Sequence, residues 1–248
     1  AGGLGTRMES LTTNKPKPMA EIGNYPILWH IMKIYSYYGF NKFYIALGYK
    51  GYAIKKFFLN YNEKFSNLKI DFKNNKVLKY NEIKEDWEVN LIDTGEHTPT
   101  GGRIKKVMEL IGDERVMVTY GDGVCNVDLK QLIQFHNNHK KLATITAVRP
   151  SARFGELELE GDTISSFKEK PQLKKGWING GFFVLEAETI KYLTDNEAFE
   201  NAPLENLSSD GNLMVFKHEG FWHPMDTKKD KTILQNYWNT KKAPWKVW

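Results

Sequence analysis

The stretch of sequence that decides the fold reads PILWHIMKIYSYYGFNKFYIALG and spans residues 26–48. Ile27, Ile31 and Ile34 recur at helical spacing, so they give the first half of this stretch one apolar face. The run FYIAL, residues 43–47, follows closely and is short, apolar and rich in strand-forming residues. A helix that leads into a buried strand is typical of α/β domains, in which helices cover a central sheet.

The alternation of helices and strands continues along the chain. Strands are predicted at residues 89–92, 116–120, 143–148, 181–185 and 213–216, and helices at residues 51–58, 102–111, 129–139 and 228–238. Further helices are expected after Ala187 and after Pro203. Because strands that alternate with helices form parallel sheets, the sequence predicts a mostly parallel sheet with helices on both faces.

A second pattern begins near residue 154. Residues 156–159 alternate polar and apolar side chains, Asp162 marks a turn, and residues 164–167 form another short run, which predicts a small antiparallel β appendage. Residues 65–83 are rich in Asn and Lys with poor periodicity, so we interpret them as an exposed excursion or a contact between subunits. We expect a single domain over residues 1–248.

Composition places the chain among globular proteins. Apolar residues make up 41% and charged residues 26% of the 248, which is enough to build a core. The net charge of +5 suits either a nucleic acid or a phosphorylated small molecule as partner. Lysines are scattered rather than gathered in a tail or in one helix, which favours ordinary solvent-exposed lysines, and we expect no nucleic acid partner.

Two further features concern the cellular compartment. Cys125 is the only cysteine, so no intramolecular disulfide can form, which agrees with a reducing compartment. No apolar run is long enough to cross a bilayer, and the first residues lack the pattern of a signal peptide. We therefore expect a soluble, cytoplasmic protein with no membrane partner. Cys125 has no base beside it and the six histidines show no zinc-binding spacing, so neither residue type is expected to be catalytic.

The first residues have the composition of a phosphate-binding loop. Three glycines, a hydroxyl group and an arginine follow one another in AGGLGTR, residues 1–7. Glycines let backbone N–H groups approach anionic oxygens, and the guanidinium of Arg7 would add a permanently charged, forked donor. Lys17 follows between Pro16 and Pro18, which stiffen the backbone that carries its ammonium group.

The combination of GGLGTR and KPKPM resembles the opening motif of the sugar-1-phosphate nucleotidylyltransferases, a family with a Rossmann-like nucleotide-binding fold. The resemblance extends over nearly the whole chain. It implies that Arg7 and Lys17 contact the triphosphate as catalytic groups. It also implies nucleotide contacts for the rest of the loop, which comprises Ala1, Gly2, Gly3, Leu4, Gly5 and Thr6. In the family a buried first strand leads into this loop, and here that first strand is missing from the sequence.

Two aspartates are candidates for binding a metal ion. Asp122 lies between Gly121 and Gly123, directly after a predicted strand, and ligands bind at the carboxyl edge of such sheets. Mg²⁺ takes a few carboxylates together with phosphate oxygens and water, although a turn-forming aspartate is the alternative. Asp226 precedes the last predicted helix, where an N-cap role is the alternative. The resemblance implies that Asp122 and Asp226 bind Mg²⁺ and that Asp122 is catalytic.

A polar loop at residues 93–103 separates a predicted strand from a predicted helix. Such a loop can present backbone groups to a base and an arginine to a phosphate. It resembles the corresponding stretch of the branch of the family that uses CTP and glucose 1-phosphate. The resemblance implies nucleotide contacts for Thr98, Arg103 and Gly121, and an ordinary structural loop is the alternative.

Two later motifs resemble the sugar-phosphate-binding elements of the family. The stretch FKEKP, residues 167–171, implies that Glu169 binds sugar hydroxyls and that Lys170 binds the sugar phosphate, and an ordinary charged turn is the alternative. The stretch WINGG precedes a predicted strand, and the resemblance implies that its Asn179 holds a sugar hydroxyl. A β-rich subregion around residues 151–226 would therefore bind the sugar.

Taken together, the motifs predict transfer of a cytidylyl group from CTP to glucose 1-phosphate. The sugar phosphate would attack the α-phosphorus in line and expel pyrophosphate, with Mg²⁺ as cofactor. One alternative keeps the reaction but uses UTP or dTTP with another sugar 1-phosphate, and a second is an inactive relative that binds nucleotide sugars. A nucleic-acid-binding protein rests on the basic pI alone. The family resemblance also implies a homo-oligomer.

Overall fold

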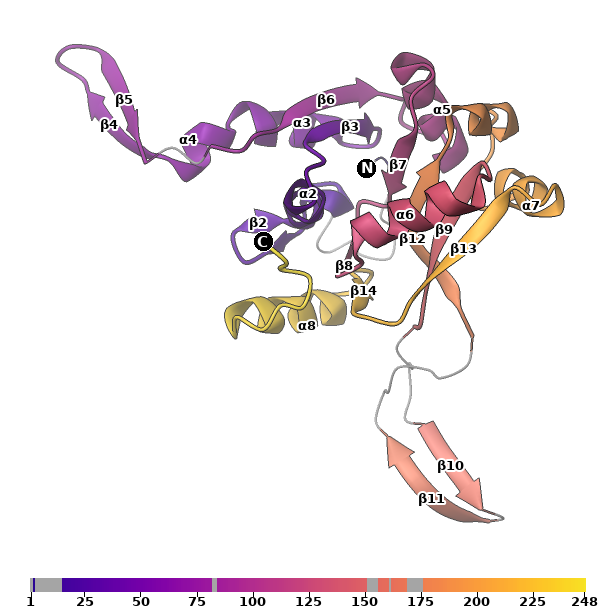
Figure 1. Cartoon of the computed structure of the whole chain (residues 1–248). Coiled ribbons are helices and arrows are strands. Elements are labelled where there is room, and N and C mark those ends of the chain that lie inside the picture. The colour runs from indigo at the N-terminus through magenta and orange to yellow at the C-terminus, as the bar shows by residue number, and fades with distance from the viewer. Residues whose placement is uncertain (1, 3–14, 82–83, 151–155, 161, 169–175) are drawn as a thin grey trace.

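The computed structural model describes residues 2, 15–81, 84–150, 156–160, 162–168 and 176–248 (Figure 1). Its helices are η2 (Lys17–Met19), α2 (Ile27–Tyr37), α3 (Gly51–Leu59), α4 (Tyr61–Phe65), α5 (Thr100–Ile111), α6 (Leu129–His139), η3 (Ala187–Tyr192), α7 (Ala202–Ser209) and α8 (Lys228–Asn239). Its strands are β1 (Glu21–Ile22), β2 (Tyr25–Pro26), β3 (Lys42–Leu47), β4 (Asn67–Asp71), β5 (Lys76–Tyr80), β6 (Glu88–Asp93), β7 (Val116–Thr119), β8 (Gly123–Cys125), β9 (Ala143–Val148), β10 (Glu156–Glu160), β11 (Thr163–Lys168), β12 (Ile178–Leu185), β13 (Leu213–His218) and β14 (Trp222–Pro224).

The main sheet is mixed, and three of its four strands run in one direction. Its four strands lie in the order β13-β9-β12-β7, and β13 pairs with β9 in parallel. The central strand β12 is antiparallel to both of its neighbours, so the other three strands run in one direction. The predicted antiparallel appendage is confirmed as the hairpin of β10 and β11, which points away from the body (Figure 1).

Helices cover both faces of this sheet, and β12 shows why. Phe182 and Val184 pack in the same apolar cluster as Leu132 of α6. Phe183, on the opposite face, packs with Leu207 of α7 and belongs to a different cluster. Successive side chains of a strand point to opposite faces, so a continuous apolar run such as FFVL needs cover on both. The predicted arrangement of helices on both faces is therefore confirmed.

A second piece of sheet consists of β3 and β6, which pair in parallel. Within the described residues, neither strand pairs with the four-stranded sheet. Consecutive residues of β3 (42–46) and of β7 (116–119) line one pocket. Since side chains alternate between the two faces of a strand, such runs mean that the edges of β3 and β7 themselves border the pocket. Among the described residues, no strand pairs with both of these edges.

Several short elements were not predicted from periodicity. They are the strand pairs β1–β2, β4–β5 and β8–β14. The helix expected after Ala187 is a 3-10 helix, η3. The strand expected to begin at residue 181 begins earlier, because Ile178 and Asn179 already pair with Val148 and Ala147. Asn179 thus lies within β12 and not in a loop before it.

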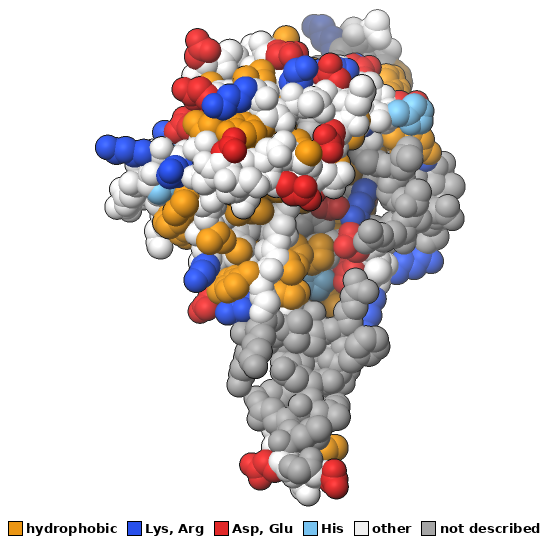
Figure 2. All heavy atoms as spheres, turned by 90° about the vertical axis from the view of Figure 1, so that its right-hand side faces the viewer, with side chains coloured by type: hydrophobic (Ala, Val, Ile, Leu, Met, Phe, Trp, Pro, Cys, Tyr) orange, Lys and Arg blue, Asp and Glu red, His pale blue; other side chains and the backbone are white. Residues whose placement is uncertain are grey.

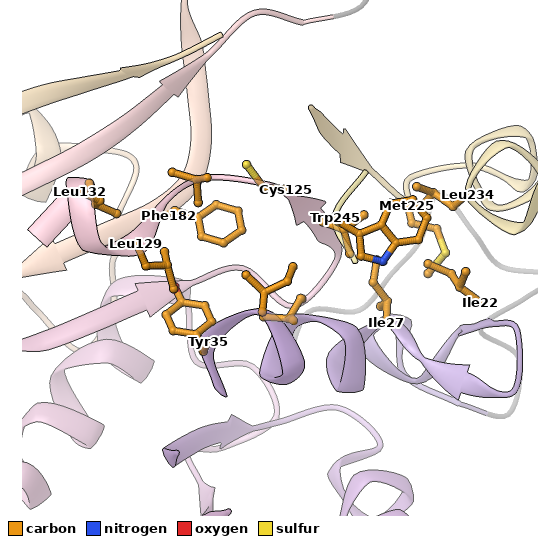
Figure 3. Packing of buried hydrophobic residues seen from close by; sticks show 14 of the residues in the cluster. Ile22, Ile27, Tyr35, Cys125, Leu129, Leu132, Phe182, Met225, Leu234 and Trp245 are labelled. Atoms are coloured by element: carbon orange, nitrogen blue, oxygen red, sulfur yellow. The ribbon is translucent and has the colours of Figure 1, made fainter. Parts of the chain in front are cut away.

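The largest apolar cluster joins elements from both ends of the chain (Figure 3). Trp245 and Leu234 come from the C-terminal part, Ile27 from α2, and Leu129 from α6, and each of these side chains is fully buried. Fully burying a side chain of this size contributes roughly 1.5–3 kcal/mol. The cluster therefore fixes α8 and the segment after it against α2 and α6.

Two surface features bear on partners. The hairpin of β4 and β5 projects from the body (Figure 1) and carries exposed apolar side chains, namely Leu68, Ile70, Val77, Leu78 and Tyr80, with Phe72 in its turn. Acidic and basic side chains are interspersed on the face shown in Figure 2. Among the described residues no helix is both long and apolar enough to span a membrane.

His30 offers a test of this packing. The ring is fully buried, Nε2 donates to the carbonyl of Ile22 at 3.0 Å, and Trp245 Nε1 donates to Nδ1 at 3.4 Å. Burial lowers the pKa of His30 to about 4. The unfolded chain, with a histidine pKa of about 6.5, then binds the proton first, so stability falls as the pH drops from about 6.5 towards 4.

We predict that His30 accounts for about 2 kcal/mol of the stability lost between pH 7 and pH 5. The measurement is the free energy of urea unfolding of the native protein and of His30→Gln at both pH values. The variant should lose less stability than the native protein over this interval, even if it is less stable throughout. The same substitution at exposed His97 is the control. Equal losses for His30→Gln and the native protein would contradict the prediction.

Candidate functional site

Three segments far apart in the sequence meet at the ammonium group of Lys17. Its Nζ donates to Asp122 Oδ2 at 2.6 Å and also to Asp226 Oδ1. Lys17 opens the short helix η2 behind Pro16, and Pro18 and Met19 are buried, which fixes the backbone beneath the ammonium group. The Lys17 side chain is 16% exposed, against 34% and 38% for the two aspartates. The cation is therefore more buried than the anions it joins.

Backbone pairing brings the two aspartates together. β8 and β14 are antiparallel, with Gly123 opposite Pro224, and Met225 N donates to the carbonyl of Asp122 at 2.7 Å. Asp122 and Asp226 therefore lie at the same end of one short ladder. Asp226 is not the N-cap of α8, because that position is taken by Thr227, which forms a capping box with Asp230. The carboxylate of Asp226 is left to face Lys17.

The electrostatics of this cluster favour a further cation. Burial by itself would lower the pKa of Lys17, but the neighbouring Asp122 and Asp226 outweigh it and the pKa is raised, so the side chain stays charged. Two carboxylates and one ammonium leave a net charge of −1. The two carboxylates supply hard oxygen ligands of the kind that Mg²⁺ takes, with its other positions filled by phosphate oxygens and water. No group of three or more His, Cys, Asp or Glu side chains suited to a metal occurs in the part of the chain that the structure describes, so the fit is to a phosphate-bound metal rather than to a closed protein cage.

These residues lie on the wall of a pocket of about 1200 Å³. Lys17, Asp122 and Asp226 line it together with Gly121, and the pocket extends from there to the edges of β3 and β7. Helices α2 and α5 contribute apolar side chains to the same wall. Asp122 follows the end of β7, so the site lies at the carboxyl end of a strand of the main sheet, as the sequence predicts.

The predicted nucleotide-binding residues Thr98 and Arg103 also line the pocket, but protein groups already hold them. Thr98 Oγ1 donates to the carbonyl of Thr94 at 2.5 Å. Arg103 is buried and donates to the carbonyls of Leu47, Gly2 and Glu96 at 2.9, 3.2 and 3.0 Å and to Thr94 Oγ1 at 2.6 Å. Its guanidinium therefore connects the end of β3, the loop before α5 and the backbone of Gly2.

Gly2 and Gly48 make room for this guanidinium. A Cβ atom on Gly2 would lie 2.3 Å from Cζ of Arg103, and one on Gly48 would lie 2.4 Å from its Nη1. Any larger residue at either position would displace Arg103. The predicted phosphate-binding loop is thus attached to the α/β core at Gly2 through a buried charged side chain. The remaining predicted loop residues, Ala1, Gly3, Leu4, Gly5, Thr6 and Arg7, lie outside the described residues, as do Glu169 and Lys170.

Asn179, predicted to bind the sugar, is held from two sides. Its Nδ2 donates to the hydroxyl of Tyr120 at 3.1 Å, and its Oδ1 accepts from Gly181 N at 2.7 Å. Tyr120 donates in turn to Glu200. Tyr120 and Glu200 line the pocket, whereas Asn179 lies behind them and is not among the described lining residues. Burial, then the carboxylate of Glu200, raise the pKa of Tyr120, so its phenol stays protonated. The sequence reasoning missed Tyr120 and Glu200; for Tyr120 the signal was its place directly before Gly121.

The residues set aside from the sequence behave as expected. Cys125 is fully buried and burial raises the pKa of its thiol to about 12, so it carries no reactive thiolate. His136 is buried between Thr144 and Glu186. Both residues are thus explained by packing and local hydrogen bonds.

The sequence and the fold were compared with those of known proteins, and the family profile and the most similar curated sequences both name nucleotidyl transferases. The sequence profile of the family described as nucleotidyl transferase matches residues 1–238. The glucose-1-phosphate cytidylyltransferases of Salmonella typhi and Salmonella typhimurium are each 49% identical over 251 residues, which cover 100% of this chain and 97% of the relative. Among solved structures, HddC from Yersinia pseudotuberculosis complexed with GMP-PN is 26% identical and superimposes with a TM-score of 0.68, over 96% of either chain.

Lys17 can be tested by its effect on stability. We expect Lys17→Met to cost about 1–3 kcal/mol in the free energy of urea unfolding, because two carboxylates lose a shared charged donor and then repel each other. Adding Asp226→Asn to that variant should restore part of the loss. Lys15→Met is the control, because exposed Lys15 lies 3.4 Å from Glu21 in a surface pair worth about 0–1 kcal/mol. Equal losses in the two lysine variants would show that the Lys17 cluster contributes no more to the free energy of unfolding than an ordinary surface ion pair.

Proposed function

The chain belongs to the nucleotidyl transferase family, and from this premise we propose that it transfers a cytidylyl group from CTP to α-D-glucose 1-phosphate, giving CDP-glucose and pyrophosphate. The convergence of Lys17, Asp122 and Asp226 on one pocket carries the proposal. The choice of CTP and glucose 1-phosphate is supported by the relatives that are 49% identical over the whole chain.

The chemistry needs no protein nucleophile. An oxygen of the sugar phosphate attacks the α-phosphorus of CTP and forms a new P–O bond, while the bond to the departing pyrophosphate breaks. Both reactants are anions, so the protein has to hold them close against their mutual repulsion. Positioning and charge neutralisation therefore account for most of the catalysis.

Lys17 has the geometry for a triphosphate contact. Its ammonium lies on the pocket wall, and Asp122 and Asp226 keep it charged and in place. Arg7 would add a second cation for the departing pyrophosphate, and Lys170 would hold the incoming sugar phosphate. Thr98 and Gly121 line the pocket and are proposed to contact the nucleotide. Arg103 would act on the nucleotide through the loops that it connects.

Mg²⁺ is the proposed cofactor, held by Asp122 and Asp226. When bound, it would neutralise phosphate charge and polarise the bond that breaks. The net charge of −1 of the cluster formed with Lys17 supports a cation there, and the two carboxylates supply oxygen ligands of the right kind. Asp122 and Asp226 also hold the Lys17 ammonium at the wall of the pocket.

Location and assembly complete the proposal. A cytoplasmic location is supported by the single, fully buried cysteine. We also propose a homo-oligomer in which the hairpin of β4 and β5 contacts a second copy, because its apolar side chains are exposed along both strands.

The proposed reaction is tested by measuring pyrophosphate release. The protein is incubated with glucose 1-phosphate, Mg²⁺ and one of CTP, UTP, dTTP or GTP, and turnover should be fastest with CTP and lost when EDTA removes the metal. Asp122→Asn and Asp226→Asn should each lower kcat by about 100- to 1,000-fold with the thermal midpoint nearly kept. Exposed Asp113→Asn is the matched control. Full activity of Asp122→Asn would refute the metal assignment. Faster turnover with another triphosphate would show that CTP is not the preferred nucleotide.

The oligomer is tested by light scattering. Replacing Ile70 and Val77 with serine removes exposed apolar surface without touching the pocket, and it should shift the mass towards the monomer of 28.7 kDa. An unchanged mass, or a native protein that is already monomeric, would contradict the proposed contact.

A further inference from the structure

A chain of hydrogen bonds beside the pocket fixes the side-chain amide of Asn179. The hydroxyl of Tyr120 accepts from Asn179 Nδ2 at 3.1 Å and donates to Glu200 Oε1. The amide oxygen of Asn179 accepts from Gly181 N at 2.7 Å. The contact with Tyr120 uses the amide nitrogen and the contact with Gly181 uses the amide oxygen, so a 180° flip of the amide would lose both hydrogen bonds.

Glu200 is itself held in place. Its second oxygen, Oε2, accepts from Thr100 Oγ1 at 2.5 Å, and Thr100 Oγ1 accepts from Phe199 N at 2.8 Å. One carboxylate oxygen of Glu200 thus accepts from Thr100, the first residue of α5, and the other accepts from Tyr120. Because a carboxylate only accepts, it forces the phenol to donate towards it, and the phenol oxygen is left to accept from Asn179.

The backbone provides a seat for the tyrosine ring. Gly181 has φ +76°, and a Cβ atom there would lie 2.5 Å from Cδ2 of Tyr120. Tyr120 N also donates to the carbonyl of Gly181 at 3.0 Å, and the ring packs against Phe183 with centroids 5.7 Å apart. Only glycine satisfies both the backbone angle and the close approach. The ring therefore cannot move without disturbing the middle of β12.

We propose that Tyr120 and Glu200 are positioning residues that preset the Asn179 amide to recognise a hydroxyl group of the sugar 1-phosphate. The inference rests on the proposed function and deepens it. Asparagine has two N–H groups and two acceptor lone pairs, so after the bonds to Tyr120 and Gly181 one donor and one acceptor remain free. A fixed donor beside a fixed acceptor discriminates between hydroxyl orientations, which a freely turning amide cannot do.

The position of Tyr120 agrees with this role. It lines the pocket together with Glu200 and Asp122, and it stands two residues before Asp122 in the same connection. The sugar-recognising amide and the proposed metal ligand are therefore fixed by one short segment.

The first experiment compares Tyr120→Phe with the native enzyme. The substitution keeps the ring and removes the hydroxyl, so KM for glucose 1-phosphate should rise by about 3- to 10-fold, the loss of roughly one hydrogen bond. KM for CTP should stay within about 2-fold. Tyr192→Phe is a closely matched control, since Tyr192 donates to Asp210 and accepts from Asn212 in the same way but lies outside the pocket lining. If Tyr120→Phe raised the KM for CTP as much as the KM for glucose 1-phosphate, or if Tyr192→Phe gave the same rise for glucose 1-phosphate, the proposal would be overturned.

The second experiment tests whether Glu200 acts through Tyr120. Glu200→Ala should resemble Tyr120→Phe, whereas Glu200→Gln keeps an acceptor for the phenol and should stay close to native. The double variant Tyr120→Phe/Glu200→Ala should be no worse than Tyr120→Phe alone, because the second change removes a contact that is already lost. Additive losses would mean that Glu200 binds the substrate directly, and the positioning role would be wrong. Glu200 is exposed, so Glu200→Ala and Glu200→Gln test the proposal even if Tyr120→Phe fails to fold.

The third experiment identifies the hydroxyl group. Glucose 1-phosphate is replaced with its 2-, 3-, 4- and 6-deoxy analogues, and for one of them the native enzyme and Tyr120→Phe should show the same KM. If every analogue keeps the full difference between the two enzymes, no hydroxyl contact depends on Tyr120 and the proposal fails. A native enzyme without activity on any sugar 1-phosphate would instead refute the proposed function, so the two failures are distinguishable.

Discussion

One ammonium group shared by two carboxylates is the interaction on which the arrangement of the pocket depends. Lys17 lies 105 residues before Asp122 and 209 before Asp226, so the contact closes two long loops of chain. Without the cation, two carboxylates at one end of a short ladder would repel each other in a partly buried setting. With it, the two side chains lie close together, and the cluster still has a formal net charge of −1. The proposed reaction would bring phosphates and a divalent cation into this pocket, and both signs of charge lie within hydrogen-bond distance of each other here.

The backbone beneath this cluster leaves the aspartates little freedom. The register of β8 against β14 places them, and Trp222 Nε1 ties the ladder to β12 by donating to the carbonyl of Gly180 at 2.8 Å. Met225, between the paired residues and Asp226, is fully buried. Preorganisation of this kind means that the charges do not have to reorient during the reaction, which is where electrostatic catalysis gains most over water. Leu234 of α8 and Trp245 belong to the same apolar cluster as Cys125 of β8 and Met225, so this cluster also supports the ladder (Figure 3).

Much of this fold could be predicted because its signals are local. Helical spacing identified α2, and short apolar runs bounded by turns identified β3 and β9. The pair of β8 and β14 could not be found in this way, because strands of three residues are too short for periodicity to appear. The hairpin of β4 and β5 was missed for a different reason: it is exposed on both faces and so shows no alternation of apolar and polar residues. Elements that are defined by burial are readable from sequence, and elements that are defined only by a partner strand are not.

The roles of single side chains were harder to read than the elements that carry them. An arginine in a polar loop before a helix suggests a phosphate contact, yet four protein acceptors surround the guanidinium of Arg103. Three of those acceptors are backbone carbonyls from separate segments, and no spacing in the sequence encodes such a meeting. Tyr120 and Glu200 show the converse, since one stands next to a recognised motif and the other follows no motif at all, while their hydrogen bond spans 80 residues. A motif records which residues touch the ligand, whereas the residues that orient them are chosen by the fold. Groups that hold another side chain in place, as Tyr120 and Glu200 hold Asn179, therefore become visible only when the hydrogen bonds of each amide and carboxylate around the pocket are traced to their ends.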